Sequence, residues 1–77
     1  MTKTTMIYRN QDGQITAKIE TATLDDGTVM IRQYKFDEQL SELVCTDKEV
    51  GTKADLRDTY IHWQETNFEN CATVTKE

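Results

Sequence analysis

The chain lacks proline, and its 77 residues include only three glycines, two cysteines, one histidine and one serine. Two cysteines are too few for a disulfide scaffold, so Cys45 and Cys71 are predicted to be reduced thiols, with a structural disulfide as the alternative. One histidine and one serine leave little material for a Ser-His-Asp site. Glycine-rich phosphate loops, C-x-x-C and H-E-x-x-H motifs are also missing. We therefore expect no catalytic residue, no metal site and no cofactor.

Long hydrophobic runs are absent as well. The first residues, MTKTTMIYRNQDGQ, contain no apolar stretch of signal-peptide length, and no segment is long enough to cross a bilayer. We expect a cytoplasmic protein that does not bind membranes. With 36% hydrophobic residues, the chain can form one small domain over residues 1–77, without room for an internal substrate cavity.

Charge is the most uneven property of the chain. Its 14 acidic and 9 basic side chains give a net charge of −5, and residues 37–77 hold ten of the acids but four of the bases. Nucleic acids and anionic membranes bind through Lys and Arg, so this balance disfavours direct contact with either. It favours a basic protein or a nucleoprotein complex as the partner.

The first half of the sequence has the pattern of a β-meander. Asp12-Gly13 and Asp26-Gly27 are hairpin signals, because these residue types tolerate the positive φ of tight turns. They separate three predicted strands at residues 4–9, 14–24 and 28–36. The predicted strand at 14–24 alternates, with Ile15, Ala17 and Ile19 on one face.

Residues 37–50 fit two structures. Leu40, Leu43 and Val44 have the spacing of a short helix that begins after Asp37, whereas residues 43–46 also fit a strand. We favour the strand, because it would complete a four-stranded meander. The polar residues 72–77 are expected to fray.

Residues 52–69 have the pattern of a capped amphipathic helix. Thr52 and Asp55 form a T-x-x-D capping box, and Leu56, Tyr60 and Trp63 form an apolar stripe of helical period. The predicted fold is therefore α+β: an antiparallel β-meander of three to four strands with one C-terminal amphipathic helix packed on one face.

The same helix carries a second line of residues, which we name the acidic stripe. It consists of Asp55, Asp58, His62, Glu65 and Glu69, whose spacings of three and four residues put all five on one face. Like charges at these spacings destabilise a helix slightly, so helix stability does not explain the stripe. It fits a solvated surface. It also fits a docking surface for a basic partner, in which the carboxylates imitate a row of phosphates. A metal site through Asp58, His62 and Glu65 is a third, weaker reading.

Two apolar residues adjoin the acidic stripe. If Ile61 and Phe68 are exposed, they would give the charged stripe an apolar rim of the kind that recognition surfaces have. If they are buried, they only widen the face that packs on the sheet.

In size, acidic charge and lack of catalytic groups, the chain resembles the small phage-encoded inhibitors of host defence, such as anti-CRISPR and anti-restriction proteins. The resemblance is one of class and is carried by no motif. It implies a small inhibitor that occludes a nucleic-acid-binding site, with Asp55, Asp58, Glu65 and Glu69 in the place of phosphates. The alternative is a structural or assembly protein that forms a homodimer, or part of a larger particle, through a sheet edge.

Overall fold

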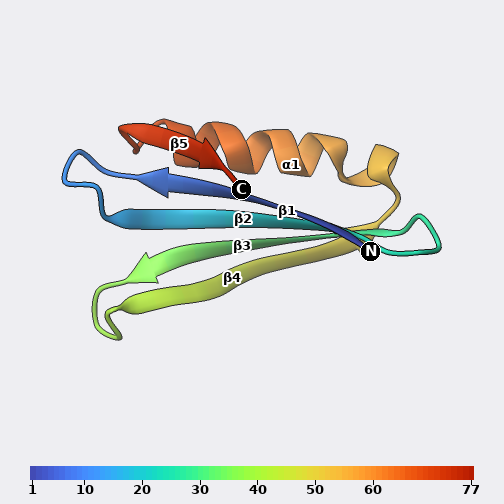
Figure 1. The fold of residues 1–77 in the computed structure, drawn as a ribbon, viewed down its shortest axis with the longest axis horizontal. Helices are drawn as coiled ribbons and strands as arrows, with labels where there is room; N and C mark the ends of the chain where they lie inside the picture. Colours follow the sequence, from blue (N-terminus) through green and yellow to red (C-terminus); the bar gives the residue numbers. More distant parts are fainter.

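The fold is one antiparallel sheet with a single helix on one of its faces (Figure 1). The computed structural model describes all 77 residues. The elements follow in the order β1 (Thr2–Arg9), β2 (Ile15–Thr23), β3 (Val29–Asp37), β4 (Glu42–Gly51), α1 (Lys53–Phe68) and β5 (Thr73–Lys76). The predicted α+β meander with a C-terminal helix is confirmed, with one strand more than expected.

The turns between the strands form for the predicted reasons. Gly13 and Gly27 have φ of 81° and 86°, so the two Asp-Gly pairs do close hairpins. The side-chain oxygen of Asn10 accepts hydrogen bonds from the backbone N–H groups of Asp12 and Gln14, and these bonds stabilise the first turn. Residues 37–50 contain the fourth strand rather than a helix, and β4 is longer than the predicted 43–46.

The expectation that residues 72–77 fray is wrong. They form β5, which pairs with the outer edge of β1 and gives the sheet the order β4-β3-β2-β1-β5. Backbone hydrogen bonds in both directions between Thr5 and Glu77, and one from Ala72 to Arg9, close this pairing. Val74 lies opposite Tyr8 and packs against the core, so one apolar residue and the open edge of β1 together order the segment.

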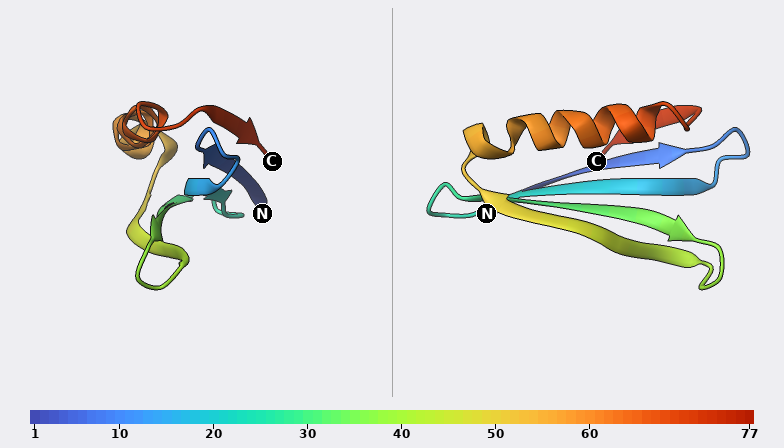
Figure 2. Two further views of the ribbon diagram at one scale, coloured as in Figure 1. Left: turned by 90° about the vertical axis from the view of Figure 1, so that its left-hand side faces the viewer. Right: turned by 180° about the vertical axis from the view of Figure 1, so that it is seen from behind.

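The hydrophobic core lies between the sheet and α1. Looking along the strands, Figure 2 shows the helix on one side of a twisted sheet, with the other side uncovered. The core consists of Tyr8, Ala17, Ile19, Val29, Ile31, Leu56 and Trp63. Ala17 and Ile19 were predicted to share one face, and both lie in this core. The helix is too short and too polar to cross a membrane.

Candidate functional site

The acidic stripe is held outward by the residues that anchor α1 to the sheet. The Thr52 side chain accepts the Asp55 backbone N–H at 3.1 Å, so the predicted cap is formed and fixes the first turn. Leu56 and Trp63 are buried, and Tyr60 is half-buried beside them. Because the stripe lies on the opposite side of the helix, its side chains point into solvent.

All five residues of the acidic stripe are exposed, and the structure brings them together as one line. From Asp55 to Glu69 the line runs about 21 Å, at 1.5 Å per residue. The ion pairs of the molecule involve only the N-terminus with Asp25, and Lys3 and Lys18 with Glu20, so no carboxylate of the stripe has a cationic partner. The last helical turn has no basic residue to offset Glu65 and Glu69.

Ile61 and Phe68 are exposed, at 39% and 66%, which decides between the two alternatives left open by the sequence. They border a shallow groove of about 620 Å³ between α1 and the sheet, with Met6, Tyr8 and Val74 on its other wall. Glu65 and Glu69 border the same groove. The acidic stripe therefore has an apolar margin on the side that faces β1 and β5.

A second groove continues along the same side of the helix and was not predicted. It measures about 870 Å³, and its apolar wall includes Met6 and Tyr60. Basic side chains from Lys53, Arg57 and Lys76 border it, as does Thr21, whose buried hydroxyl has no hydrogen-bond partner. This groove exists because α1 lies over β2, β3 and β4 and leaves β1 and β5 partly uncovered. No sequence signal indicates where along the sheet a helix will lie.

A buried polar chain under the C-terminal half of α1 was also missed. Asn67 donates to the Gln33 side-chain oxygen at 2.6 Å and to the Trp63 carbonyl at 2.9 Å. Gln33 in turn donates to the Asp47 carboxylate at 2.8 Å. Hydrogen bonds from the Thr46 hydroxyl and the Gln33 amide hold the pKa of Asp47 below its usual range. These contacts fix the helix position across β3 and β4, so they support the acidic stripe without belonging to it.

The structure contains no metal-ligating cluster and no paired cysteines. Asp58, His62 and Glu65 do not form a cluster that could hold a metal ion, and neither does any other group of three such side chains. Cys45 and Cys71 are both free, as predicted. Cys45 is exposed on β4, whereas Cys71 is partly buried against the core. The acidic stripe with its apolar margin therefore remains the candidate site that both sequence and structure describe.

Comparison of the chain with models of known protein families, with curated proteins and with solved structures finds no match.

Proposed function

We propose that this chain is a protein-interaction module, acting as an inhibitor, whose acidic stripe docks on the basic, nucleic-acid-binding surface of a partner protein. The observation that carries the proposal is the set of four exposed carboxylates, aligned over about 21 Å, of which none has a cationic partner within the molecule. The helix dipole stabilises Asp55 in the first turn, but Glu65 and Glu69 near the other end are disfavoured by it, and like charges at these spacings cost helix stability. A partner with Lys and Arg at matching positions would supply the missing counterions.

The surroundings of the acidic stripe support docking on protein. Charged side chains steer a partner and select it, but the desolvated contacts of an interface are mainly apolar and aromatic. Phe68 and Ile61 provide such contacts beside Glu65 and Glu69, on a helix that is anchored to the sheet by Leu56 and Trp63. Because the anchored face is opposite, the stripe can bind without rearrangement of the core.

A charge-reversal experiment tests the proposal. Asp55, Asp58, Glu65 and Glu69 are replaced by lysine, and tagged protein is used to capture binding proteins from a lysate of the native host, with elution in a salt gradient. A matched control replaces four other exposed acids by lysine, namely Asp12, Glu38, Glu42 and Glu77, so that both variants have the same net charge. We expect the natural chain and the control to retain a basic, nucleic-acid-binding protein that elutes in moderate salt.

The stripe variant should lose that partner, with an affinity at least about tenfold weaker and a flatter dependence on salt. Phe68→Ser should weaken binding without changing the salt dependence, because it removes apolar contact and no charge. Retention of the partner by the stripe variant, with unchanged salt dependence, would overturn the proposal. Equal loss in the stripe variant and the control would show that only net charge matters, which also contradicts it.

A second candidate is self-association through the edge of the sheet. β4 is an edge strand of ten residues, and nothing in the molecule covers its outer side. Lys48 between Asp47 and Glu49 places charges along this edge, which natural proteins use to prevent pairing, so we rank the candidate second. Sedimentation at several concentrations tests it: a monomer at all of them would exclude a stable homodimer.

A further inference from the structure

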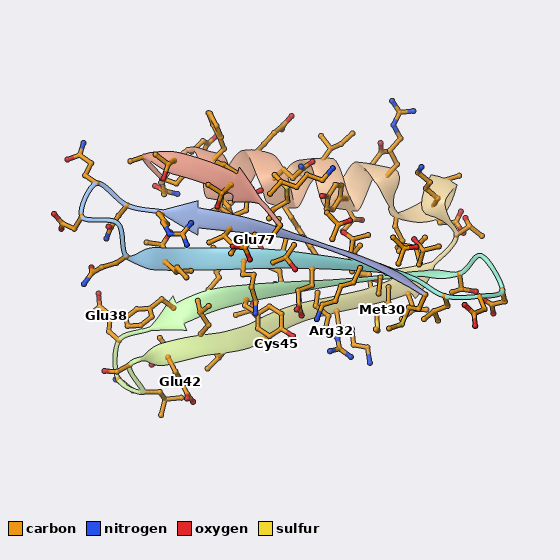
Figure 3. The ribbon with its side chains drawn as sticks, viewed as in Figure 1. Met30, Arg32, Glu38, Glu42, Cys45 and Glu77 are labelled. Carbon is orange, nitrogen blue, oxygen red and sulfur yellow. The ribbon has the colours of Figure 1, made fainter.

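The face of the sheet opposite α1 is uncovered and has the opposite charge to the molecule as a whole. Figure 3 looks onto this face and labels Met30, Arg32, Cys45 and Glu77 on it. Strand register places Arg32 beside Lys48 and Tyr34 beside Lys18, and side chains paired in this way share a face. Five of the nine Lys and Arg residues lie on it: Lys3, Arg9, Lys18, Arg32 and Lys48. We name this surface the basic face.

Two carboxylates lie on the basic face: Glu20 is already neutralised, whereas Glu77, which pairs with Thr5 at the edge of the sheet, has no ion pair. Glu20 lies 3.0 Å from the Lys3 ammonium and 3.9 Å from that of Lys18. Burial alone would raise the pKa of Glu20, but Tyr34, Lys3 and Lys18 outweigh it, and the pKa is lowered. Arg32 and Lys48 have no carboxylate partner in the molecule, and they lie side by side on neighbouring strands.

Aromatic side chains are interleaved with these cations. Arg32, Tyr34 and Phe36 occupy successive positions on the basic face of β3, about 7 Å apart along the strand. Phe36 is 46% exposed although it lies on a central strand, and Lys18 lies 4.5 Å above the ring centre of Tyr34. The pattern of a cation and two aromatics at alternate positions is the one that sheet-based binders of single-stranded nucleic acid use.

We propose that the basic face binds single-stranded nucleic acid, with Arg32 and Lys48 at phosphates and a base stacked on Phe36. Single strands are the form that fits, because unpaired bases offer rings that can stack on Phe36, whereas the bases of a duplex are already stacked on one another. The acidic helix of a second copy also has the complementary charge, but it would make no use of the exposed aromatic ring.

The net charge of −5 does not oppose this binding as strongly as the composition indicates. Most of the fourteen acids lie elsewhere, since strand register puts only Glu20 and Glu77 on the basic face, and charges beyond about 8 Å are largely screened at physiological salt. The expectation that the chain makes no direct contact with nucleic acid used the whole-chain balance of charge, and this proposal departs from it because five basic residues share one face. The basic face and the acidic stripe are separate surfaces, so one proposal can fail without the other.

Fluorescence anisotropy with labelled oligonucleotides of about 12 nucleotides tests the proposal. The probes are oligo-dT, oligo-rU and a DNA duplex of equal length, titrated with the natural chain at about 50 mM salt and then at higher salt. We expect saturable binding of one or both single strands and at least about tenfold weaker binding of the duplex. A preference between dT and rU separates DNA from RNA as the natural ligand. The two phosphate contacts at Arg32 and Lys48 would give log K a slope of about −1.4 against log salt.

Matched variants locate the contact. The pair Arg32→Gln and Lys48→Gln should weaken binding at least about tenfold and flatten the salt slope, whereas Lys53→Gln with Arg57→Gln, the same charge change on α1, should have little effect. Phe36→Ala should weaken binding about fivefold or more, and Leu40→Ala, another exposed apolar residue, should not. Circular dichroism of each variant separates loss of contact from loss of fold.

Three outcomes would overturn the proposal. The first is no binding of either single strand at low salt. The second is binding of the duplex as tight as that of a single strand, or a loss of affinity in Lys53→Gln with Arg57→Gln as large as in Arg32→Gln with Lys48→Gln. Either result would indicate non-specific attraction to phosphate. The third is concentration-dependent self-association at low salt that Arg32→Gln with Lys48→Gln abolishes, which would make the helix of a second copy the occupant.

Discussion

Asn67 is a polar residue in the part of α1 that packs on the sheet, and it is buried at 8% exposure. Its amide donates to Gln33, so removal of the Asn67 side chain leaves the Gln33 oxygen buried without that donor. We predict that Asn67→Ala lowers the free energy of unfolding by about 1–3 kcal/mol, the usual cost of an unsatisfied buried polar group. Urea denaturation of both proteins measures it.

The control for this prediction is the exposed Asn70, three residues later. Its amide donates to the Thr66 carbonyl at 3.4 Å in the last turn of the helix, in contact with solvent. Asn70→Ala should therefore change the free energy of unfolding by less than about 0.5 kcal/mol. Equal effects of the two substitutions would show that the hydrogen bond from Asn67 to Gln33 contributes no more to stability than an exposed asparagine amide does.

Tyr8 gives a pH dependence whose sign follows from its burial. Burial raises the pKa of Tyr8 to about 12, and nearby Tyr60 and Cys71 add to the effect. In the unfolded chain its pKa is about 10, so as the pH rises from 10 towards 12 the unfolded state loses a proton that the folded state keeps. The contribution is complete below pH 10 and is lost over this window. We predict that Tyr8→Phe reduces the fall in stability between about pH 9 and pH 11.

Urea denaturation of the natural chain and of Tyr8→Phe at both pH values checks this. Lysine deprotonation and other alkaline effects are common to the two proteins, so the difference between their pH slopes isolates Tyr8. Identical slopes would mean that the phenol reaches solvent in the folded state.

At the residue scale, apolar positions were more predictable than polar ones. Ala17 and Ile19 follow from strand alternation alone. Gln33 shares the face of Val29 and Ile31 by the same rule, but its burial depends on Asn67, which is 34 residues away and reaches it only through the crossing position of the helix. Long-range pairs of this kind leave no local pattern in one sequence.

At the scale of elements, the start of α1 depends on one hydroxyl. Thr52 accepts the Asp55 amide, one of four that have no partner within a helix. We predict that Thr52→Ala lowers the free energy of unfolding by about 1 kcal/mol, whereas Thr52→Ser, which keeps the hydroxyl, has a much smaller effect. Thermal melts followed by circular dichroism compare the variants. A serine variant as unstable as the alanine variant would assign the effect to the lost methyl group instead.

Elements with two consistent local signals were predicted correctly; β4, whose signal also fitted a helix, was predicted as a strand but too short, and β5 was not predicted. β2 has both alternation and Asp-Gly turns at its two ends, and α1 has both a cap and an apolar stripe. β5 has a single partly buried residue, Val74, and its stability comes from backbone pairing with β1. Such a strand forms because the edge of β1 offers unpaired backbone N–H and C=O groups. This edge exists only in the folded sheet, so the local sequence does not predict the strand.

At the scale of the whole molecule, the two surfaces proposed for binding point away from each other. The acidic stripe lies on the outer side of α1, and the basic face lies on the opposite side of the sheet. A partner that is a nucleoprotein complex could offer protein to one surface and nucleic acid to the other.

The acidic stripe could be predicted from the sequence because its residues repeat at helical spacing within one helix. The basic face could not, because its cations come from four strands, and net charge averages over both sides.

The whole molecule should unfold as one cooperative unit, since neither layer can bury its apolar side alone. Leu56 and Trp63 of α1 complete a core that consists otherwise of sheet residues, and 11 of the 77 residues are buried in all. Trp63 is the only tryptophan, so its fluorescence reports the contact between helix and sheet, while circular dichroism reports both elements. We predict the same urea midpoint by both probes, and we predict that Leu56→Ala lowers both together. An earlier midpoint for Trp63 fluorescence would contradict this, because it would mean that α1 leaves a sheet that remains folded without it.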